Sequence, residues 1–217
     1  EKFGLFSPKF SYARIFINNR NLGVYLVAEA WSPELLAKNN IIDNNNIFSN
    51  KDEKWVDINN VPAFYHWKSY TAEIEDGPFE ELNALGELVN KATDEEFNRK
   101  VEALVDLEKV YKWQIINVLA GSAHQSYFSN FVLLFRKETG KFEPIPWNVE
   151  FEPLKDKIYD DNLPLLVRRI FQNQKYSDQF TSLLKSYLEE ENLKDDLAYY
   201  DSLVKNLKND FYKDQAK

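Results

Sequence analysis

The sequence predicts an α+β fold in which helix outweighs strand, and two observations carry this prediction. Apolar residues recur at helical spacing over most of the chain after Pro78. In addition, two pairs of short segments, each pair flanking a turn, are rich in the β-branched and aromatic residues of β-hairpins. The chain has 217 residues, 44% of them hydrophobic, so it can bury a substantial core.

The first hairpin is predicted near the start of the chain. The pattern predicts strands over residues 12–18 and 22–29, on either side of an asparagine-rich turn. A short helix follows, because Ser32 is a favourable N-cap, Pro33 suits the first helical position, and the helical pattern runs to Lys38.

The remaining elements follow in order. Residues 39–62 are rich in asparagine and aperiodic, which predicts a loop with a short strand near residues 54–58. Three helices are predicted over residues 79–92, 94–104 and 106–119, with Gly121 ending the third. A second hairpin over residues 131–136 and 141–145 precedes three helices near residues 163–172, 176–190 and 193–213.

The composition limits the classes of function. The net charge is −8, which argues against nucleic-acid partners and against docking on anionic lipid. No apolar run reaches the roughly 18 residues of a membrane helix, so no transmembrane segment is predicted. Disulfide and thiol chemistry are excluded because there is no cysteine. With only His66 and His124 as histidines, zinc chemistry is also disfavoured.

Four stretches carry a more specific signal through their order along the chain. They are Phe16–Glu29, Ile116–Gly121, Asn130–Phe135 and Lys141–Trp147, and the C-terminal Asp210–Asp214 agrees with them. In this order, these stretches resemble four features of the CotH spore-coat kinase family. The features are a hairpin, the end of the helix before the catalytic loop, the strand after that loop, and an Ile-Pro-Trp-Asp segment. That family is an atypical branch of the protein-kinase-like fold.

The resemblance implies a kinase-like C-lobe that contains a hinge β-hairpin and a catalytic-loop β-hairpin. It places the end of an N-lobe at residues 1–30 and the C-lobe at residues 31–217, with most of the N-lobe absent from this chain. It also implies ATP and Mg²⁺ as cofactors, a protein substrate or binding partner, and a spore-coat or cell-surface location. The glycine-rich phosphate loop of protein kinases is missing from the sequence.

In the kinase-like frame, Glu29, Ala30 and Trp31 correspond to the hinge, where backbone groups bind the adenine edge. Backbone hydrogen bonding in an apolar slot tolerates many side chains. The same residues also suit an ordinary connection between a strand and a helix, with Trp31 packing on the body.

Residues 124–130 correspond to the catalytic loop. Phosphoryl transfer uses a carboxylate near the substrate hydroxyl and, five residues later, an amide that holds magnesium. Asn130 suits the amide position, and the carboxylate position is Gln125, which can orient a nucleophile but cannot accept a proton at neutral pH. The neighbouring His124 can act as a base near pH 7. In the alternative interpretation, His124 and Gln125 are polar loop residues and Asn130 caps the turn before its strand.

The resemblance places a magnesium-binding aspartate at position 148, with a second oxygen ligand two residues later. Magnesium prefers anionic oxygen ligands, so Asn148 weakens the predicted site and Glu150 restores one charge. Along an extended chain both side chains face one side. The alternative is that Glu150 is a surface carboxylate and no metal site survives.

Two functions follow from these residues. The first is ATP- and Mg²⁺-dependent phosphorylation of serine or threonine by a divergent or weakened kinase. The second is a catalytically inactive, pseudokinase-like coat or surface protein that acts in protein–protein interaction or adhesion. In the second case, some of Phe64, Tyr65, Trp67 and Tyr70 are expected to form a partner-binding patch. The sequence makes no prediction of the oligomeric state.

Overall fold

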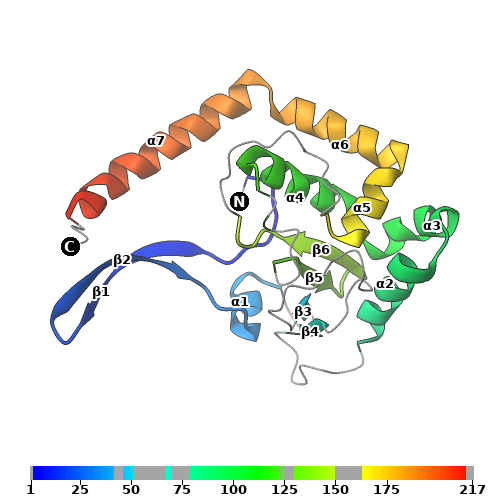
Figure 1. Ribbon diagram of the computed structural model, residues 1–217, viewed down its shortest axis with the longest axis horizontal. Coiled ribbons are helices and arrows are strands. Elements are labelled where there is room, and N and C mark those ends of the chain that lie inside the picture. The colour runs from blue at the N-terminus through cyan, green and yellow to red at the C-terminus, as the bar shows by residue number, and fades with distance from the viewer. Residues whose placement is uncertain are drawn as a thin grey trace. The chain divides into compact units, whose positions relative to one another are not determined.

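The computed structural model describes residues 2–41, 46–50, 67–69, 79–122, 124, 130–149 and 163–213. The fold is α+β with more helix than strand, which confirms the predicted class (Figure 1). The chain divides into two compact units. One unit comprises Glu1–Ser7 and Trp31–Phe180, and the other comprises Pro8–Ala30 and Thr181–Lys217.

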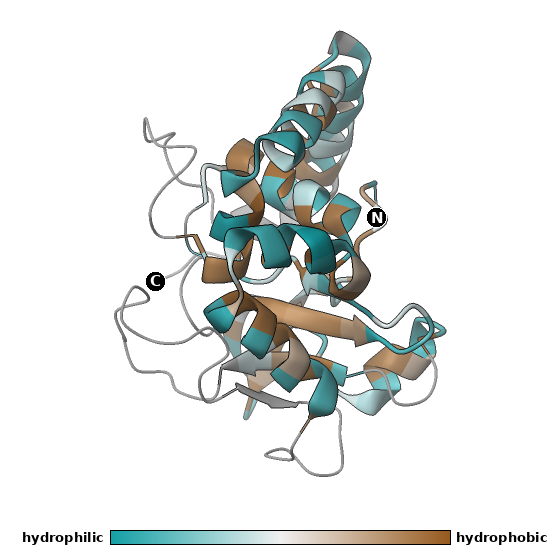
Figure 2. Cartoon of the chain, turned by 90° about the vertical axis from the view of Figure 1, so that its right-hand side faces the viewer, coloured by the Kyte–Doolittle hydropathy of each residue, from teal (hydrophilic) through white to brown (hydrophobic). Residues whose placement is uncertain are grey.

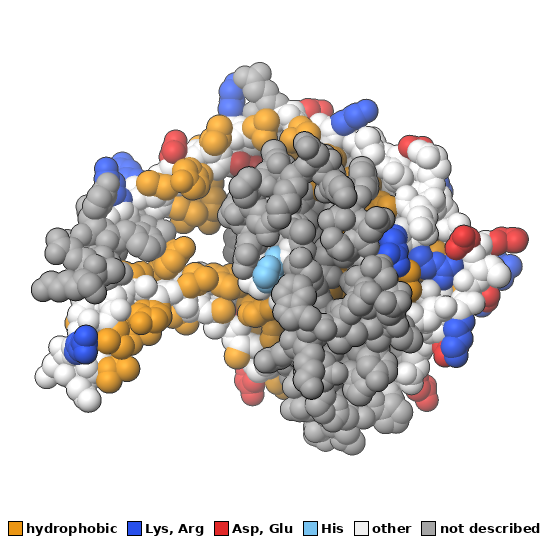
Figure 3. Space-filling model, in the orientation of Figure 1, with side chains coloured by type: hydrophobic (Ala, Val, Ile, Leu, Met, Phe, Trp, Pro, Cys, Tyr) orange, Lys and Arg blue, Asp and Glu red, His pale blue; other side chains and the backbone are white. Residues whose placement is uncertain are grey.

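The second unit contains the first predicted hairpin. Strand β1 (Phe10–Ile17) pairs antiparallel with β2 (Arg20–Ala28) around a turn at Asn18 and Asn19. Both turn residues have positive φ, of 50° and 64°, a conformation that asparagine adopts more readily than most residues. Apolar side chains of both strands are exposed, including Phe16 at 61%, and they appear in orange in Figure 3.

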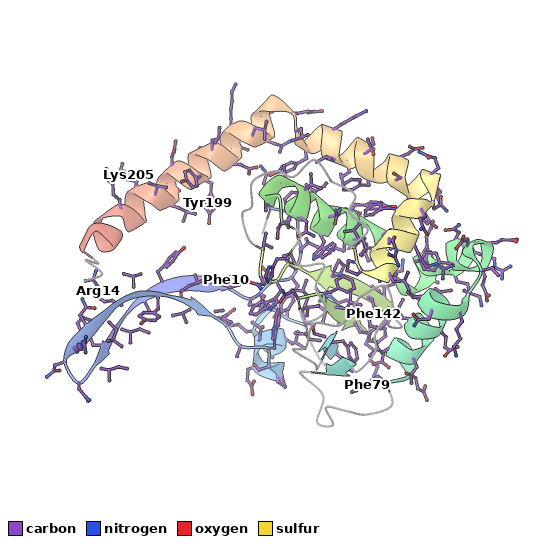
Figure 4. The ribbon with its side chains drawn as sticks, viewed as in Figure 1. Phe10, Arg14, Phe79, Phe142, Tyr199 and Lys205 are labelled. Atoms are coloured by element: carbon purple, nitrogen blue, oxygen red, sulfur yellow. The ribbon has the colours of Figure 1, made fainter. Side chains whose placement is uncertain are left out.

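The same unit ends in the long helix α7 (Glu190–Lys213). Apolar side chains are exposed on it as well, among them Leu197 and Tyr199. Figure 4 labels Tyr199 and Lys205 on this helix, and Phe10 and Arg14 on the hairpin. Among the helices that the structure describes, none is both long enough and apolar enough to cross a membrane.

The first unit is built around a four-stranded antiparallel sheet. Its strand order is β4 (Trp67–Ser69), β3 (Asn46–Asn50), β5 (Val132–Arg136), β6 (Lys141–Ile145). The predicted β5–β6 hairpin is confirmed, with Gly140 in its turn at φ 67°.

The prediction of a loop over residues 39–62 is wrong at β3. This strand forms because Ile47 and Phe48 are fully buried and because it pairs with β5, which is distant in the sequence. The strand expected near residues 54–58 lies outside the described residues.

The predicted helices are present, and the caps expected at Ser32 and Gly121 are found. The helices are α1 (Pro33–Lys38), α2 (Glu80–Lys91), α3 (Asp94–Leu104), α4 (Leu107–Ala120), α5 (Leu165–Gln172) and α6 (Gln174–Tyr187). The hydroxyl of Ser32 accepts a hydrogen bond from the Leu35 amide at 3.2 Å. Gly121 closes α4 in the left-handed conformation, at φ 65°.

Aromatic side chains fill the core where the helices pack on the sheet. Helices α3 and α4 both pack against β6. Phe48 lies between Phe79 and Phe142, with ring centroids 5.0 Å and 6.1 Å away. Figure 4 labels Phe142 in the sheet and Phe79 before α2, and Figure 2 shows an apolar strand among helices that carry both hydrophilic and hydrophobic residues. Burial of such a side chain contributes about 1.5–3 kcal/mol.

A single arginine joins α5 to the end of α2. The Arg169 guanidinium donates hydrogen bonds to the carbonyl oxygens of Leu88, Val89 and Ala92, at 3.1, 2.8 and 2.9 Å. It also donates to the Asp94 carboxylate at 2.9 Å. The last carbonyls of a helix have no partner within the helix, so Arg169 satisfies groups that α2 cannot satisfy itself.

Candidate functional site

The candidate site lies at one end of the β5–β6 hairpin. The last paired residues at this end of the ladder are Val132 and Ile145. Asn130 lies just before this pair along the chain, and Asn148 lies just after it. Because the two strands are antiparallel, the fold brings Asn130 and Asn148, two of the three predicted metal ligands, to the same end of the hairpin.

Asn130 is buried, with 9% of its surface exposed. Its side-chain Nδ2 donates a hydrogen bond to the backbone carbonyl of His124 at 3.2 Å. A planar amide directs its oxygen away from its nitrogen, so this bond turns Oδ1 away from the His124 carbonyl. The side chain therefore ties together the two ends of the predicted catalytic loop.

The strand that follows Asn130 is fixed from two sides. The Ser49 hydroxyl, on β3, donates to the Phe131 carbonyl oxygen at 3.2 Å. The Phe131 ring packs edge-on against Trp113 of α4, with centroids 5.5 Å apart and planes at 63°. These contacts hold the start of β5 between the sheet and α4.

The C-terminal half of α4 carries polar side chains that the sequence interpretation did not select. Gln114 and Asn117 are buried, with 3% and 5% exposure, and Ser122 beyond the helix end has 9%. Among the described residues, no group forms a hydrogen bond with the buried Oε1 of Gln114. The available signal was two polar residues at helical i, i+3 spacing within the otherwise apolar C-terminal half of the helix.

The other side of the site begins at Trp147. This partly buried side chain packs on the apolar cluster of the first unit and lies against Trp31, with ring centroids 4.9 Å apart. Asn148 is exposed and has φ of 51°. The extended backbone expected from residue 148 to residue 150 is therefore wrong at Asn148, which adopts the left-handed conformation that asparagine tolerates.

The predicted hinge residues have defined local contacts. The Glu29 amide donates to the Lys9 carbonyl at 3.1 Å, and the Glu29 carboxylate accepts from the Lys9 amide at 2.8 Å. Glu29 thus closes the open end of the β1–β2 hairpin. Ala30 follows it in the second unit, and Trp31 begins the long segment of the first unit.

Gln125 and Glu150 lie outside the residues that the structure describes, and so does most of the region with the predicted aromatic patch. Within the described ranges, no group of three or more His, Cys, Asp or Glu side chains is placed to hold a metal ion. The described candidates at this end of the hairpin are two neutral amides, from Asn130 and Asn148, and the partly buried His124. The two amides can offer oxygen atoms to a cation, and all three side chains can form hydrogen bonds with a substrate hydroxyl.

Comparisons with known proteins identify the family. A family model described as CotH kinase protein matches residues 1–217. The inner spore coat protein H of Bacillus subtilis (strain 168) is 26% identical over 160 residues, which cover 68% of this chain and 42% of the relative. The chain thus spans less than half the length of this curated relative. The spore-coat relative supports the location expected from the resemblance. The match of the family model over the whole chain shows that the protein belongs to the CotH family.

Proposed function

We propose that this chain binds ATP with Mg²⁺ and transfers a phosphoryl group to serine or threonine hydroxyls of a protein, at a lower rate than a full set of catalytic carboxylates would allow. The observation that carries the proposal is the buried Asn130, held by its amide nitrogen at the start of β5. Membership of a family described as kinase proteins supports it.

The Asn130 side chain fits a magnesium ligand. Its amide nitrogen is occupied by the His124 carbonyl, and Oδ1 is the atom that a hard cation prefers. Asn148, at the same end of the hairpin, offers a second neutral oxygen, and Glu150 is proposed to supply the negative charge. Bound Mg²⁺–ATP supplies the phosphoryl group. In this proposal the protein positions that group and the accepting hydroxyl.

The proposed roles of the loop residues follow from their protonation chemistry. His124 accepts the proton of the substrate hydroxyl, and Gln125 orients that hydroxyl by hydrogen bonding. Removal of one preorganised charged or donor group from an active site costs about 2.7–4 kcal/mol, or 10²–10³ in rate. With amides at positions 125 and 148, slow turnover is expected.

The rest of the kinase-like frame belongs to the same proposal. Residues 1–30 would end an N-lobe, residues 31–217 would form a C-lobe, and Glu29, Ala30 and Trp31 would meet the adenine edge through backbone groups.

Calorimetric titration with ATP, with and without Mg²⁺, tests the nucleotide site, and phosphate incorporation into protein tests turnover. The Asn130→Ala variant should weaken Mg²⁺-dependent ATP binding at least tenfold. Asn90→Ala is a matched control, because the Asn90 amide also donates to a backbone carbonyl but lies exposed on α2. Equal affinities in the two variants, or no ATP binding at millimolar concentration, would refute the proposal.

A pseudokinase-like coat protein is the second candidate, favoured by Asn148. Its left-handed backbone gives asparagine a structural reason to occupy this position without any metal. In this alternative the chain acts by binding a protein partner in the spore coat. The Asn148→Asp variant separates the two candidates. Tighter Mg²⁺-dependent ATP binding and faster turnover than in the unchanged chain would indicate a weakened kinase, whereas an inactive variant would support the coat protein.

A further inference from the structure

Trp31 and Trp147 form an aromatic pair beside the candidate site. Their ring centroids are 4.9 Å apart and their planes are inclined by 58°. Both side chains are partly buried and pack on one apolar cluster, whose buried members include Leu36, Ile41 and Ile145. Trp147 is the residue immediately before Asn148, so one member of the pair is joined by a peptide bond to a proposed metal ligand.

The position of Trp31 is fixed by the start of α1. Ser32 is the N-cap of this helix, with an extended backbone at φ −159° and ψ 161°. Trp31 therefore precedes the cap, and Leu36 occupies the fourth helical position. These are the two positions of a hydrophobic staple, an arrangement that fixes the direction in which the chain enters a helix. Leu36 and Trp31 both belong to the same apolar assembly, consistent with this arrangement.

The hydrogen-bonded ladder of β6 does not extend to Trp147. Strand β6 ends at Ile145, so Trp147 lies beyond the last hydrogen-bonded pair of the ladder. The next residue turns into the left-handed conformation, at φ 51°, and its side chain is exposed. Packing of the Trp147 ring against Trp31 is one restraint on the backbone that presents Asn148.

We propose that Trp31 is a positioning residue that fixes the backbone at Asn148 through its contact with Trp147. The inference rests on the proposed function, in which the residue at position 148 offers an oxygen atom to Mg²⁺. The Trp31 side chain touches neither nucleotide nor metal in this proposal, and only its backbone belongs to the proposed hinge. Its effect on metal affinity passes through the Trp147 ring and the peptide bond that follows it. A large planar ring is needed at position 31, and phenylalanine is the conservative replacement.

Two measurements on the intact chain test this inference independently of turnover. Amide hydrogen exchange at Trp147 and Asn148, measured by NMR without ligand, reports whether Trp31 restrains this backbone. Trp31→Ala should accelerate exchange of both amides at least tenfold, and Trp31→Phe should keep them within about threefold of the original. Ile41→Ala is the control, because Ile41 is a buried member of the same cluster but carries no aromatic ring. Equal acceleration in the Trp31→Ala and Ile41→Ala variants would overturn the positioning role.

The second measurement is the affinity for Mg²⁺ in the presence of ATP, in an Asn148→Asp background. Trp31→Ala should weaken it at least fivefold, with recovery in Trp31→Phe and little effect of Ile41→Ala. If no Mg²⁺ binds even without the Trp31 change, the proposed function fails, while the exchange data still decide whether Trp31 restrains Asn148. If Mg²⁺ binds equally well in all variants, the positioning inference fails and the proposed function stands.

Discussion

The two ends of the candidate site hold the same type of side chain for different physical reasons. Asn130 is buried, and its amide forms a hydrogen bond with the His124 carbonyl. Asn148 is exposed, and its backbone is left-handed. At the first position the side chain itself is needed, whereas at the second the left-handed backbone favours asparagine or aspartate over most other residues. The comparison teaches that the same residue type can be held at one position by a side-chain hydrogen bond and at another by a backbone conformation.

The largest loss of stability is expected on the buried side of the site, from truncation of Phe131, the residue after Asn130. Phe131→Ala removes a ring with 4% exposure that packs against Trp113. Truncation of a buried phenylalanine to alanine costs about 3–5 kcal/mol, and urea denaturation followed by circular dichroism measures it. Phe16→Ala, at an exposed ring, should change the free energy of unfolding by less than about 0.5 kcal/mol. Similar losses in both variants would contradict the described burial.

A smaller loss is expected from the amide itself. Asn130→Ala leaves the His124 carbonyl without its side-chain donor, which should lower the free energy of unfolding by about 1–3 kcal/mol. The Asn90→Ala control breaks a similar bond at the surface, where water replaces it, so its loss should be clearly smaller. The same denaturation experiment compares the two variants. A larger loss of unfolding free energy for Asn90→Ala than for Asn130→Ala would contradict the burial of Asn130.

At the exposed side, backbone conformation should decide the outcome. Asn148→Val places a β-branched residue at φ 51° and should cost about 1–2 kcal/mol, because the left-handed region is strained for such residues. Asn148→Gly should be tolerated, since glycine adopts this conformation freely. If valine and glycine give equal stability, the left-handed conformation does not hold in solution.

The smallest change in stability is expected for Asn148→Asp, because aspartate also tolerates positive φ and the side chain is exposed. Without metal, the variant should unfold within about 0.5 kcal/mol of the original. Added Mg²⁺ and ATP should then raise its melting temperature more than that of the unchanged chain, because ligands that bind only the folded state stabilise it. A larger rise in the unchanged chain would show that aspartate does not improve the site.

The sequence predicted the elements whose signals are local. Ser32 and Gly121 mark helix ends through their own side-chain or backbone chemistry, and the structure has those ends there. Strand β3 was missed because its asparagine and serine residues resemble a loop, whereas its stability comes from pairing with β5 and from the burial of Phe48. Such long-range effects leave no periodic signal in a short segment.

The sequence predicted which positions belong to the site, but the geometry of the site became visible only in the folded structure. Spacing along the chain selected Asn130 and Asn148, and the sheet places them at one end of a hairpin. The hydrogen bond to His124 and the left-handed turn at Asn148 depend on tertiary contacts and backbone torsion, which residue types do not specify. Gln114 was overlooked because a buried polar residue in a helix is recognised only once its surroundings are known.

The bonds from Arg169 to the end of α2 have a kinetic consequence. Three carbonyl groups at that helix end accept hydrogen bonds from a side chain that lies about eighty residues later in the chain. Closure of so long a loop is entropically costly, so this connection should form late in folding. Arg169→Met should therefore accelerate unfolding and leave the refolding rate almost unchanged, which stopped-flow measurements would reveal. A slower refolding rate would instead assign the α2–α5 connection to the folding nucleus. In the expected case, the lifetime of the folded chain, more than its ability to fold, depends on this one guanidinium.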